Sequence, residues 1–309
     1  MRYRRLGKTD WQVSAVSMGC WGIGGQWGPV AEDEAIRTMH LALDLGVNLF
    51  DTADAYGQGL SEELVGKAFR GKRDGIYIAT KVGNFARRVN HPLSYESPEH
   101  VYLCCDASLG RMKIDTIDLY QCHLGDLGDP SIFLEAMERL VEKGKVRHYG
   151  ISTNRLDVVE RFNRGGQCAS CQINYSIVNQ SAAAEILPYC LANDIGTLIR
   201  GPIAQGVLAG KFNPQSTFDD IVREGWNTGT SRERFLRQLE TVEKLRILER
   251  PERSLAQAAL QWVLANPAVT TPIPGAKNVA QIRSNSLAAD GELTADELAR
   301  VRSVSEEWA

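Results

Sequence analysis

The sequence lacks any apolar run near the ~20 residues that a membrane-spanning helix needs. Its opening residues, "MRYRRLGKTDWQVS", are charged, and no apolar stretch follows them, so they do not form a secretory signal. A strong charge of either sign is also missing, since the net charge is -3 over 309 residues. This balance gives no electrostatic reason to expect nucleic acid or a membrane surface as a partner.

Patterns typical of metal sites and disulfide frameworks are scarce. The seven cysteines are odd in number and scattered, apart from the adjacent Cys104 and Cys105, and no Cys/His group has zinc spacing. We therefore expect no metal, and free thiols in a reducing compartment, the cytoplasm. Cys122, beside His123, is either a redox-sensitive thiol or a small buried strand residue, and we favour the buried residue.

A glycine-rich dinucleotide-binding turn is absent as well. The nearest candidate, "GIGGQWG" at residues 22–28, departs from GxGxxG because Trp27 takes the place of the third glycine. No helical pattern follows it directly. This argues against a doubly wound Rossmann sheet, the main rival among α/β folds.

Short β-rich runs alternate with longer helical patterns along the whole chain, which predicts a (β/α)8 TIM barrel. The expected strands are "AVSMG", "VNLFD", "GIYIATK", "TIDLYQCH", "RHYGIS", "SCQINY", "GTLIRG" and "VTTPIPG", with helical patterns such as "DEAIRTMHLALDLG", "PEHVYLCCDASLGRM" and "PSIFLEAMERLVEKG" between them. Helix caps are expected at Asp33 and Ser97 at the start and at Gly46 and Gly144 after the end.

We expect one domain over residues 1–309, with additions to the barrel. Residues 1–14 predict a capping β-hairpin, and further helices follow the long polar loop at residues 211–231. A loop of this length is usually functional or disordered. Its aromatic residues, Phe212, Phe218 and Trp226, would suit a lid or a pocket wall.

Titratable side chains end three consecutive predicted strands. Asp51 ends the second strand, Lys81 the third and His123 the fourth, and Tyr56 lies in the loop after Asp51. Taken singly, each has an ordinary explanation as a loop cap, a surface lysine or a core histidine. Because the carboxyl ends of barrel strands meet at one rim, where catalytic groups collect, their joint placement predicts an active site.

These residue types indicate proton transfer to or from an oxygen. A phenol, with a reference pKa of about 10, becomes a usable acid when a neighbouring ammonium stabilises its anion. Lys81 can supply that charge, Asp51 can hold the lysine, and His123 can hydrogen-bond the substrate oxygen. No side chain supplies a hydride, so reduction of a carbonyl would need a nicotinamide cofactor.

The segments "RRLGKTDWQVS", "NLFDTADAYG", "SEELVGKAF", "IATKVG", "IDLYQCHL" and "YGIS" occur in the order of the aldo-keto reductase signatures. The chain resembles that family over essentially its whole length, most closely the bacterial members related to potassium-channel β-subunits. The resemblance implies a barrel that binds NADP(H) without a Rossmann fold, with NAD(H) also open. It also implies a catalytic tetrad of Asp51, Tyr56, Lys81 and His123, in which Tyr56 donates the proton.

The resemblance further implies a set of cofactor positions. "GPIAQGVLAGK" is similar to the pyrophosphate-binding loop, and "IPGAKNVAQIRSN" to the adenosine-binding segment. A lysine at the 2′-phosphate position favours NADPH through a charge-assisted contact. The implied positions are Gly19, Cys20, Trp21, Asp51, Ser152, Thr153, Gln172, Arg200, Gly201, Pro202, Ile203, Gly206, Leu208, Gly210, Lys211, Gly275, Ala276, Lys277, Gln281 and Asn285.

Two positions depart from the family pattern. The family usually has Asn directly after the serine that binds the carboxamide, whereas here Thr153 comes between Ser152 and Asn154, which leaves two alternatives. The family usually stacks an aromatic ring on the nicotinamide, where this chain has Arg200. A planar guanidinium can also stack, and its charge should disfavour the cationic, oxidised ring.

Three functions are open from the sequence. They are an NADPH-dependent reductase of aldehydes, ketones or sugars, a sugar or polyol dehydrogenase that uses the same site in reverse, and a cofactor-binding regulatory subunit with little turnover. Candidate walls of a pocket for a small carbonyl or sugar substrate are Trp21, Trp27, Phe85 and Trp226, with Arg87 and His91 as candidate polar contacts.

Overall fold

The computed structural model describes residues 1–85 and 93–309. Within these ranges eight strands form one parallel sheet in chain order. They are β3 (Met18–Gly19), β4 (Leu49–Asp51), β5 (Tyr77–Val82), β6 (Ile117–Cys122), β7 (Val146–Ser152), β8 (Ser170–Asn174), β9 (Gly196–Arg200) and β10 (Thr271–Pro272). The amides of Ser17 and Gly19 donate to the carbonyls of Pro272 and Pro274 at 3.0 and 3.1 Å, so the last strand returns to the first. The predicted barrel is confirmed.

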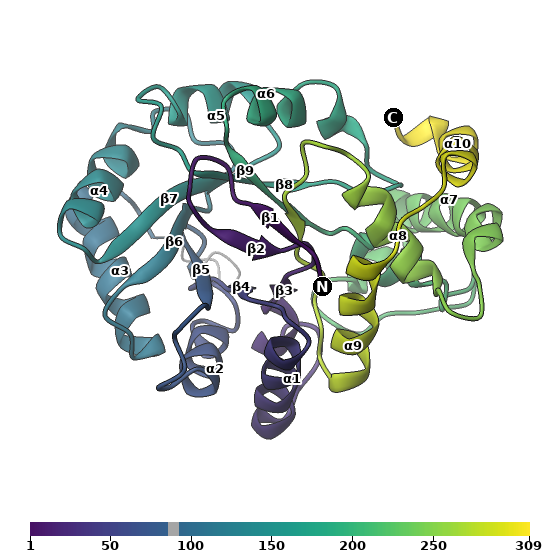
Figure 1. The fold of residues 1–309 in the computed structure, drawn as a ribbon, viewed down its shortest axis with the longest axis horizontal. Coiled ribbons are helices and arrows are strands. Elements are labelled where there is room, and N and C mark those ends of the chain that lie inside the picture. Colours follow the sequence, from purple (N-terminus) through teal and green to yellow (C-terminus); the bar gives the residue numbers. More distant parts are fainter. Residues whose placement is uncertain (86–92) are drawn as a thin grey trace.

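Helices surround this sheet, as Figure 1 shows. They are α1 (Glu32–Asp44), α2 (Leu60–Ala68), α3 (Pro98–Met112), α4 (Ser131–Glu142), α5 (Leu156–Phe162), α6 (Ile186–Ala192), α7 (Gly229–Leu245), α8 (Leu255–Leu264), α9 (Val279–Leu287) and α10 (Ala295–Val304). The main core lies between strands and helices, where apolar residues such as Phe50, Met137 and Ile151 are buried. None of the helices in the described ranges is long and apolar enough to cross a membrane.

The helix ends follow the sequence with one exception. Gly46 and Gly144 have φ of +87° and +70° directly after α1 and α4, and glycine adopts this left-handed conformation without steric cost. Ser97 is the N-cap of α3. The prediction for Asp33 is wrong, because α1 begins at Glu32 with Ala31 as its N-cap. Asp33 therefore lies in the first turn, where an acidic side chain is favoured by the helix dipole.

The hairpin expected over residues 1–14 is present and covers one end of the barrel. Strands β1 (Tyr3–Arg5) and β2 (Gln12–Ser14) pair antiparallel, and Figure 1 shows them lying across the ring of strands. Leu6, Trp11 and Val13 pack against inward-facing strand residues, including Leu49 and Leu198. Since this cluster fills the end that the hairpin covers, the carboxyl ends of the strands form the other, working end.

The long loop has more structure than its sequence indicates. It contains a 3-10 turn, η5 (Glu224–Asn227), and α7 begins at Gly229, inside the predicted range of 211–231. Phe218 is buried, and its ring lies 5.2 to 5.4 Å from those of Phe212, Phe235 and Trp226. These aromatic residues, expected to serve as a lid or a pocket wall, form a small core between the loop and α7.

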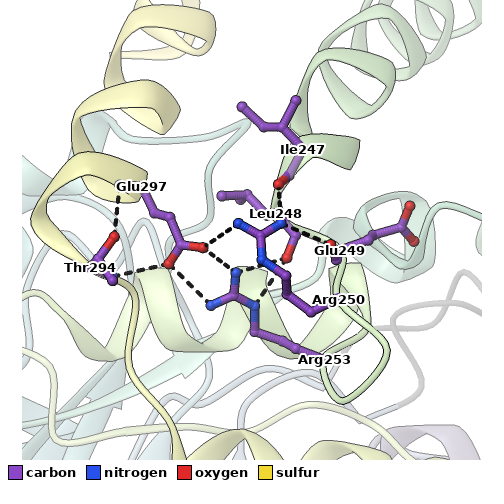
Figure 2. Close-up of polar contacts among 7 residues, drawn as sticks. All are labelled: Ile247, Leu248, Glu249, Arg250, Arg253, Thr294 and Glu297. Atoms are coloured by element: carbon purple, nitrogen blue, oxygen red, sulfur yellow. Dashed lines mark hydrogen bonds and ion pairs between the residues drawn. The ribbon is translucent and has the colours of Figure 1, made fainter.

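The C-terminal helix α10 is tied to the barrel by one buried carboxylate, shown in Figure 2. Glu297 pairs with Arg250 and Arg253 at 3.1 Å and forms a capping box with Thr294. The arginines in turn donate to backbone carbonyls that follow α7, including that of Leu248. Hydrogen bonding to Arg253 lowers the pKa of Glu297 to about 2, so this link is ionised at neutral pH.

Candidate active site

Four predicted catalytic residues stand at the working end of the barrel. Asp51 ends β4 and Lys81 lies near the end of β5, and both are almost completely buried. His123 directly follows β6. Tyr56 lies in the loop after β4, where its amide donates to the carbonyl of Ala53 at 3.1 Å. The four side chains therefore come from adjacent strands, as the sequence predicts.

Lys81 is the centre of this group. Its ammonium donates to Asp51 Oδ2 at 2.7 Å, to the Thr52 carbonyl at 2.7 Å and to the Tyr56 hydroxyl at 3.1 Å. Three acceptors satisfy the three N–H bonds of the ammonium, so the side chain is fixed in position although it is buried. The hydroxyl of Tyr56 thus receives a hydrogen bond from a charged donor.

The pKa of the phenol differs from the simple expectation. Burial raises the pKa of Tyr56 above its ordinary value, and although Lys81 and Arg200 lower it, the net direction is upward. Burial also opposes the charge of Lys81, but Asp51 and Tyr56 outweigh it and raise the pKa of the ammonium. Tyr56 is therefore a protonated acid at neutral pH, beside a lysine that keeps its charge.

The loop that carries Tyr56 packs closely against the turn after β3. Gly57 has a φ of +61°, and a Cβ at this position would lie 2.3 Å from the carbonyl oxygen of Gly24. Only glycine permits this approach. Trp21 is stacked beside Tyr56, with ring centroids 5.8 Å apart, and the ring of His123 stands edge-on at 6.2 Å. Two rings thus flank the phenol.

Two amide side chains inside the barrel point their donors at Asp51, and one of them was not predicted from the sequence. Gln172 Nε2 donates to Asp51 Oδ1 at 2.8 Å, and Gln121 Nε2 approaches the same atom at 3.4 Å. Gln121 was not predicted as a site residue. Inward-facing residues alternate along a strand, so the spacing of Leu119, Gln121 and His123 carried a usable signal.

Thr153 and Asn154, the two alternatives after Ser152, have different hydrogen-bond partners. The hydroxyl of Thr153 donates to the Gly125 carbonyl at 2.7 Å, and the residue is buried. Asn154 is exposed and receives a hydrogen bond from Arg200 at 3.1 Å. Asn154, rather than Thr153, therefore stands with Arg200 at the end of the strands.

The segment predicted to bind pyrophosphate has an unusual backbone. After Gly201, with a φ of +63°, the neighbours Ala204 and Gln205 have φ of +48° and +54°, and Gly206 follows at +97°. Consecutive non-glycine residues in this region are strained, and such strain clusters at ligand sites. Of the other predicted positions, Pro202 and Leu208 are buried, Ile203 is partly buried, and Gly210 takes a φ of +70°.

Three cations gather beyond this segment. Partial desolvation lowers the pKa of Lys211, and the nearby charges of Arg223 and Lys277 lower it further. The ammonium of Lys277 also donates to the Trp27 carbonyl at 2.7 Å. Asp220 pairs with Arg223 at 2.7 Å and offsets part of this charge, and an anionic ligand would offset the rest. Arg223 was missed from the sequence because nothing in its loop pattern distinguishes it from other surface arginines.

The predicted adenosine segment, residues 273–285, comprises the turn before α9 and most of that helix. Gln281 Oε1 accepts from the Lys277 amide at 2.8 Å, and Asn285 Nδ2 donates to the Gly275 carbonyl at 3.3 Å. Both side chains thus hold the turn that presents Lys277. Ala276 is buried in the main core.

The first loop is only partly open to a ligand. Gly19 and Cys20 lie at the end of β3, and the thiol of Cys20 is fully buried, which raises its pKa well above the ordinary value. Trp21 and Trp27 are both partly exposed and meet edge to face at 4.8 Å. Of these two predicted substrate contacts, Trp21 stands beside Tyr56, and Trp27 packs against Trp21.

The other two described candidates for substrate contacts, Phe85 and Trp226, have different neighbours. Phe85 lies near the guanidinium of Arg111, 5.9 Å from the ring centroid, and Trp226 belongs to the aromatic core of the long loop. Arg87 and His91 lie outside the described residues.

A buried acid behind the tyrosine loop was not predicted. Asp54 is 2% exposed, and neither carboxylate oxygen has a hydrogen-bond partner in the described ranges. Burial, with the nearby charge of Glu62, raises the pKa of Asp54 to about 7. Glu62 is itself buried, but it accepts from Thr80 at 2.5 Å and Arg111 at 2.6 Å.

The cysteines need one correction. Cys168 and Cys171 have CxxC spacing, which we overlooked in the sequence. Both thiols are buried, and burial raises the pKa of Cys168 to about 12. All seven cysteines are free thiols, and Cys122 is a buried strand residue. In residues 1–85 and 93–309, no group of three or more His, Cys, Asp or Glu side chains is placed to hold a metal.

Comparison with known proteins places these features in a family. A family model described as the aldo/keto reductase family matches residues 15–306. The chain is 33% identical to an uncharacterised Bacillus subtilis oxidoreductase, YqkF, over 98% of this chain and 96% of the relative. It is 30% identical to an L-galactose dehydrogenase of Arabidopsis thaliana, over 91% of this chain and 86% of that protein.

Solved structures agree with these matches. The holo form of an aldo-keto reductase from Bacillus halodurans superposes with a TM-score of 0.83 at 32% identity, covering 98% of this chain and 96% of that one. A glycerol dehydrogenase from Gluconobacter oxydans gives 0.84 at 29% identity, covering 99% and 96%. An aldo-keto reductase from Klebsiella pneumoniae in complex with NADPH gives 0.74 at 25% identity, covering 98% and 95%.

Proposed function

Since the chain belongs to the aldo/keto reductase family and is an oxidoreductase, we propose that it uses NADP(H) to reduce the carbonyl of an aldehyde, ketone or sugar to an alcohol. One observation carries the proposal. The ammonium of Lys81 joins Asp51 to the hydroxyl of Tyr56, at 2.7 and 3.1 Å, at the carboxyl ends of β4 and β5. This arrangement supports delivery of a proton to an oxygen.

In this proposal each residue of the tetrad has one task. Tyr56 gives its hydroxyl proton to the carbonyl oxygen as the alcohol forms, and His123 hydrogen-bonds the same oxygen. Lys81 stabilises the tyrosinate that results, and Asp51 keeps the lysine in place through their 2.7 Å ion pair. When bound, the reduced nicotinamide supplies the hydride.

The cofactor would lie along the strand ends from the tetrad to α9. Gln172, Ser152 and Asn154 suit the carboxamide end, because they stand beside Asp51 and Arg200. The cation group of Lys211, Arg223 and Lys277 suits the phosphates. Gln281 and Asn285 would hold the adenosine portion. NADPH is favoured over NADH because Lys277 supplies a positive charge for the 2′-phosphate beyond the charges of Lys211 and Arg223, the latter already paired with Asp220 at 2.7 Å.

Tyr56 is protonated at neutral pH, the state that carbonyl reduction needs, whereas alcohol oxidation needs tyrosinate as the base. Because a raised pKa also weakens the phenol as an acid, Lys81 must stabilise the tyrosinate as the proton leaves. The runner-up is a sugar or polyol dehydrogenase, which the similarity to a glycerol dehydrogenase and an L-galactose dehydrogenase favours. The same site would then run in reverse.

A cofactor-consumption screen tests the proposal. Aldehydes, keto sugars and polyols are offered with NADPH, NADH, NADP⁺ and NAD⁺, and cofactor binding is measured by calorimetry in parallel. We expect consumption of NADPH with carbonyl substrates at pH 7. Turnover of polyols with NADP⁺ alone would favour the dehydrogenase, and tight cofactor binding without turnover in any mixture would favour a cofactor-binding regulatory subunit. Absence of cofactor binding would contradict all three functions.

A further inference from the structure

Arg200 is the last residue of β9 and stands exposed at the working end of the barrel. Its strand pairs with β8, where Asn174 lies in register with it. Within residues 1–85 and 93–309, no carboxylate forms an ion pair with the guanidinium of Arg200. The buried cation at the site, Lys81, is already neutralised by Asp51. Arg200 is therefore a net positive charge at the mouth.

Asn154 holds this guanidinium in position. Its Oδ1 accepts from Arg200 Nη2 at 3.1 Å and also from the Asn174 amide at 2.9 Å. Its Nδ2 donates to the Asn174 carbonyl at 3.0 Å. The amide of Asn154 is thereby fixed to the end of β8. Because an acceptor fixed in this way orients its donor, Arg200 does not simply extend into solvent.

Arg200 stands on the side of the barrel that holds the reacting centre, because Gln172 of the adjacent strand β8 donates to Asp51 Oδ1 at 2.8 Å. Among the groups that alter the pKa of Tyr56, Arg200 lowers it, as Lys81 does. In a reduction, the carbonyl oxygen must meet the Tyr56 hydroxyl while its carbon meets the hydride donor. The nicotinamide must then lie close to Tyr56, within the reach of the same charge.

We propose that Arg200, oriented by Asn154, makes the site select the reduced cofactor over the oxidised one. The inference rests on the proposed function. The reduced nicotinamide ring is neutral and the oxidised ring carries a positive charge, so a cation at the mouth repels only the oxidised form. Selection of this kind favours carbonyl reduction and rapid loss of the oxidised product. At the effective dielectric constants of a protein surface, two like charges about 5 Å apart disfavour binding by about tenfold or more.

The test measures dissociation constants by calorimetry, without turnover. Arg200→Gln removes the charge, and we expect the ratio of the constants for NADP⁺ and NADPH to fall about tenfold. Arg200→Lys keeps the charge and should keep most of the ratio. Asn154→Asp leaves the arginine but places a carboxylate on it, so it should lower the ratio as Arg200→Gln does. Arg302→Gln, an exposed position in α10, serves as the matched control and should change nothing.

Salt gives an independent check, because it screens the repulsion between Arg200 and the oxidised ring. Raising the salt concentration from about 0.05 to about 0.5 M should reduce the ratio of the NADP⁺ and NADPH dissociation constants in the wild type but not in Arg200→Gln. An unchanged ratio in both Arg200→Gln and Asn154→Asp would overturn the inference while leaving the proposed function intact. If wild-type protein bound neither NADP⁺ nor NADPH, the proposed function itself would fail, and the inference with it.

Discussion

Asp54 offers a quantitative test of the electrostatics behind the catalytic loop. The side chain is 2% exposed and unpartnered among the described residues, and burial together with Glu62 raises its pKa from 3.8 to about 7. Because the folded pKa lies above the unfolded one, the wild type is most stable below pH 4 with respect to this group. That stability is lost as the pH rises through 7. Asp54→Asn removes the titration.

The magnitude follows from the size of the shift. About three pKa units correspond to an upper limit of about 4 kcal/mol, of which about 3 kcal/mol develops between pH 5 and pH 8. An asparagine amide without partners costs about 1–3 kcal/mol, but this cost does not depend on pH. The diagnostic quantity is therefore the change with pH of the difference in unfolding free energy between variant and wild type.

Urea denaturation followed by tryptophan fluorescence at pH 5, 6, 7 and 8 measures this difference. Asp54→Asn should gain stability relative to wild type as the pH rises, by about 3 kcal/mol over that range. The exposed Asp74→Asn is a matched control, and its difference from wild type should stay constant. A flat difference for Asp54→Asn would show that this carboxyl has an ordinary pKa, and the account of a buried, neutral acid would be wrong.

Three further predictions concern other parts of the molecule. Gly57→Ala pushes the tyrosine loop away from the backbone of the turn after β3, so kcat/KM should fall at least about tenfold while NADPH affinity is retained. The control is Gly71→Ala, which has a similar φ of +69° and open space around it and should keep full activity. Glu297→Gln should lower the unfolding free energy at pH 7 by about 1–3 kcal/mol, and since the folded pKa is depressed, the loss should shrink as the pH falls from 4.5 toward 2 in urea titrations. Arg223→Met should weaken NADPH binding about tenfold and flatten its salt dependence in calorimetry; unaltered affinity would remove this arginine from the phosphate site.

The sequence predicts those features of the fold and site that follow from a regular pattern of strands and helices. The alternation of strands and helices located the barrel, and strand ends placed Asp51, Lys81 and His123 on one rim. Left-handed glycines marked the ends of α1 and α4. These features depend on local patterns, which a single chain carries in full.

Features that depend on tertiary neighbours were out of reach. Nothing local distinguishes Asp54 as buried, or shows that Thr153 turns away while Asn154 meets Arg200. The raised pKa of Tyr56 also follows from burial, which depends on the tertiary structure and outweighs the charge of Lys81. The packing of Trp226 into a loop core has the same origin.

The central claim is that Tyr56 supplies the proton while other residues bind the cofactor. Stopped-flow measurement of NADPH oxidation at pH 7, with the carbonyl substrate found in the screen, compares wild type with Tyr56→Phe. We predict that the rate of the hydride step falls about 10²–10⁴-fold while the dissociation constant for NADPH stays within about twofold. A Tyr56→Phe variant that binds NADPH normally and keeps more than about a tenth of the wild-type rate would contradict the account.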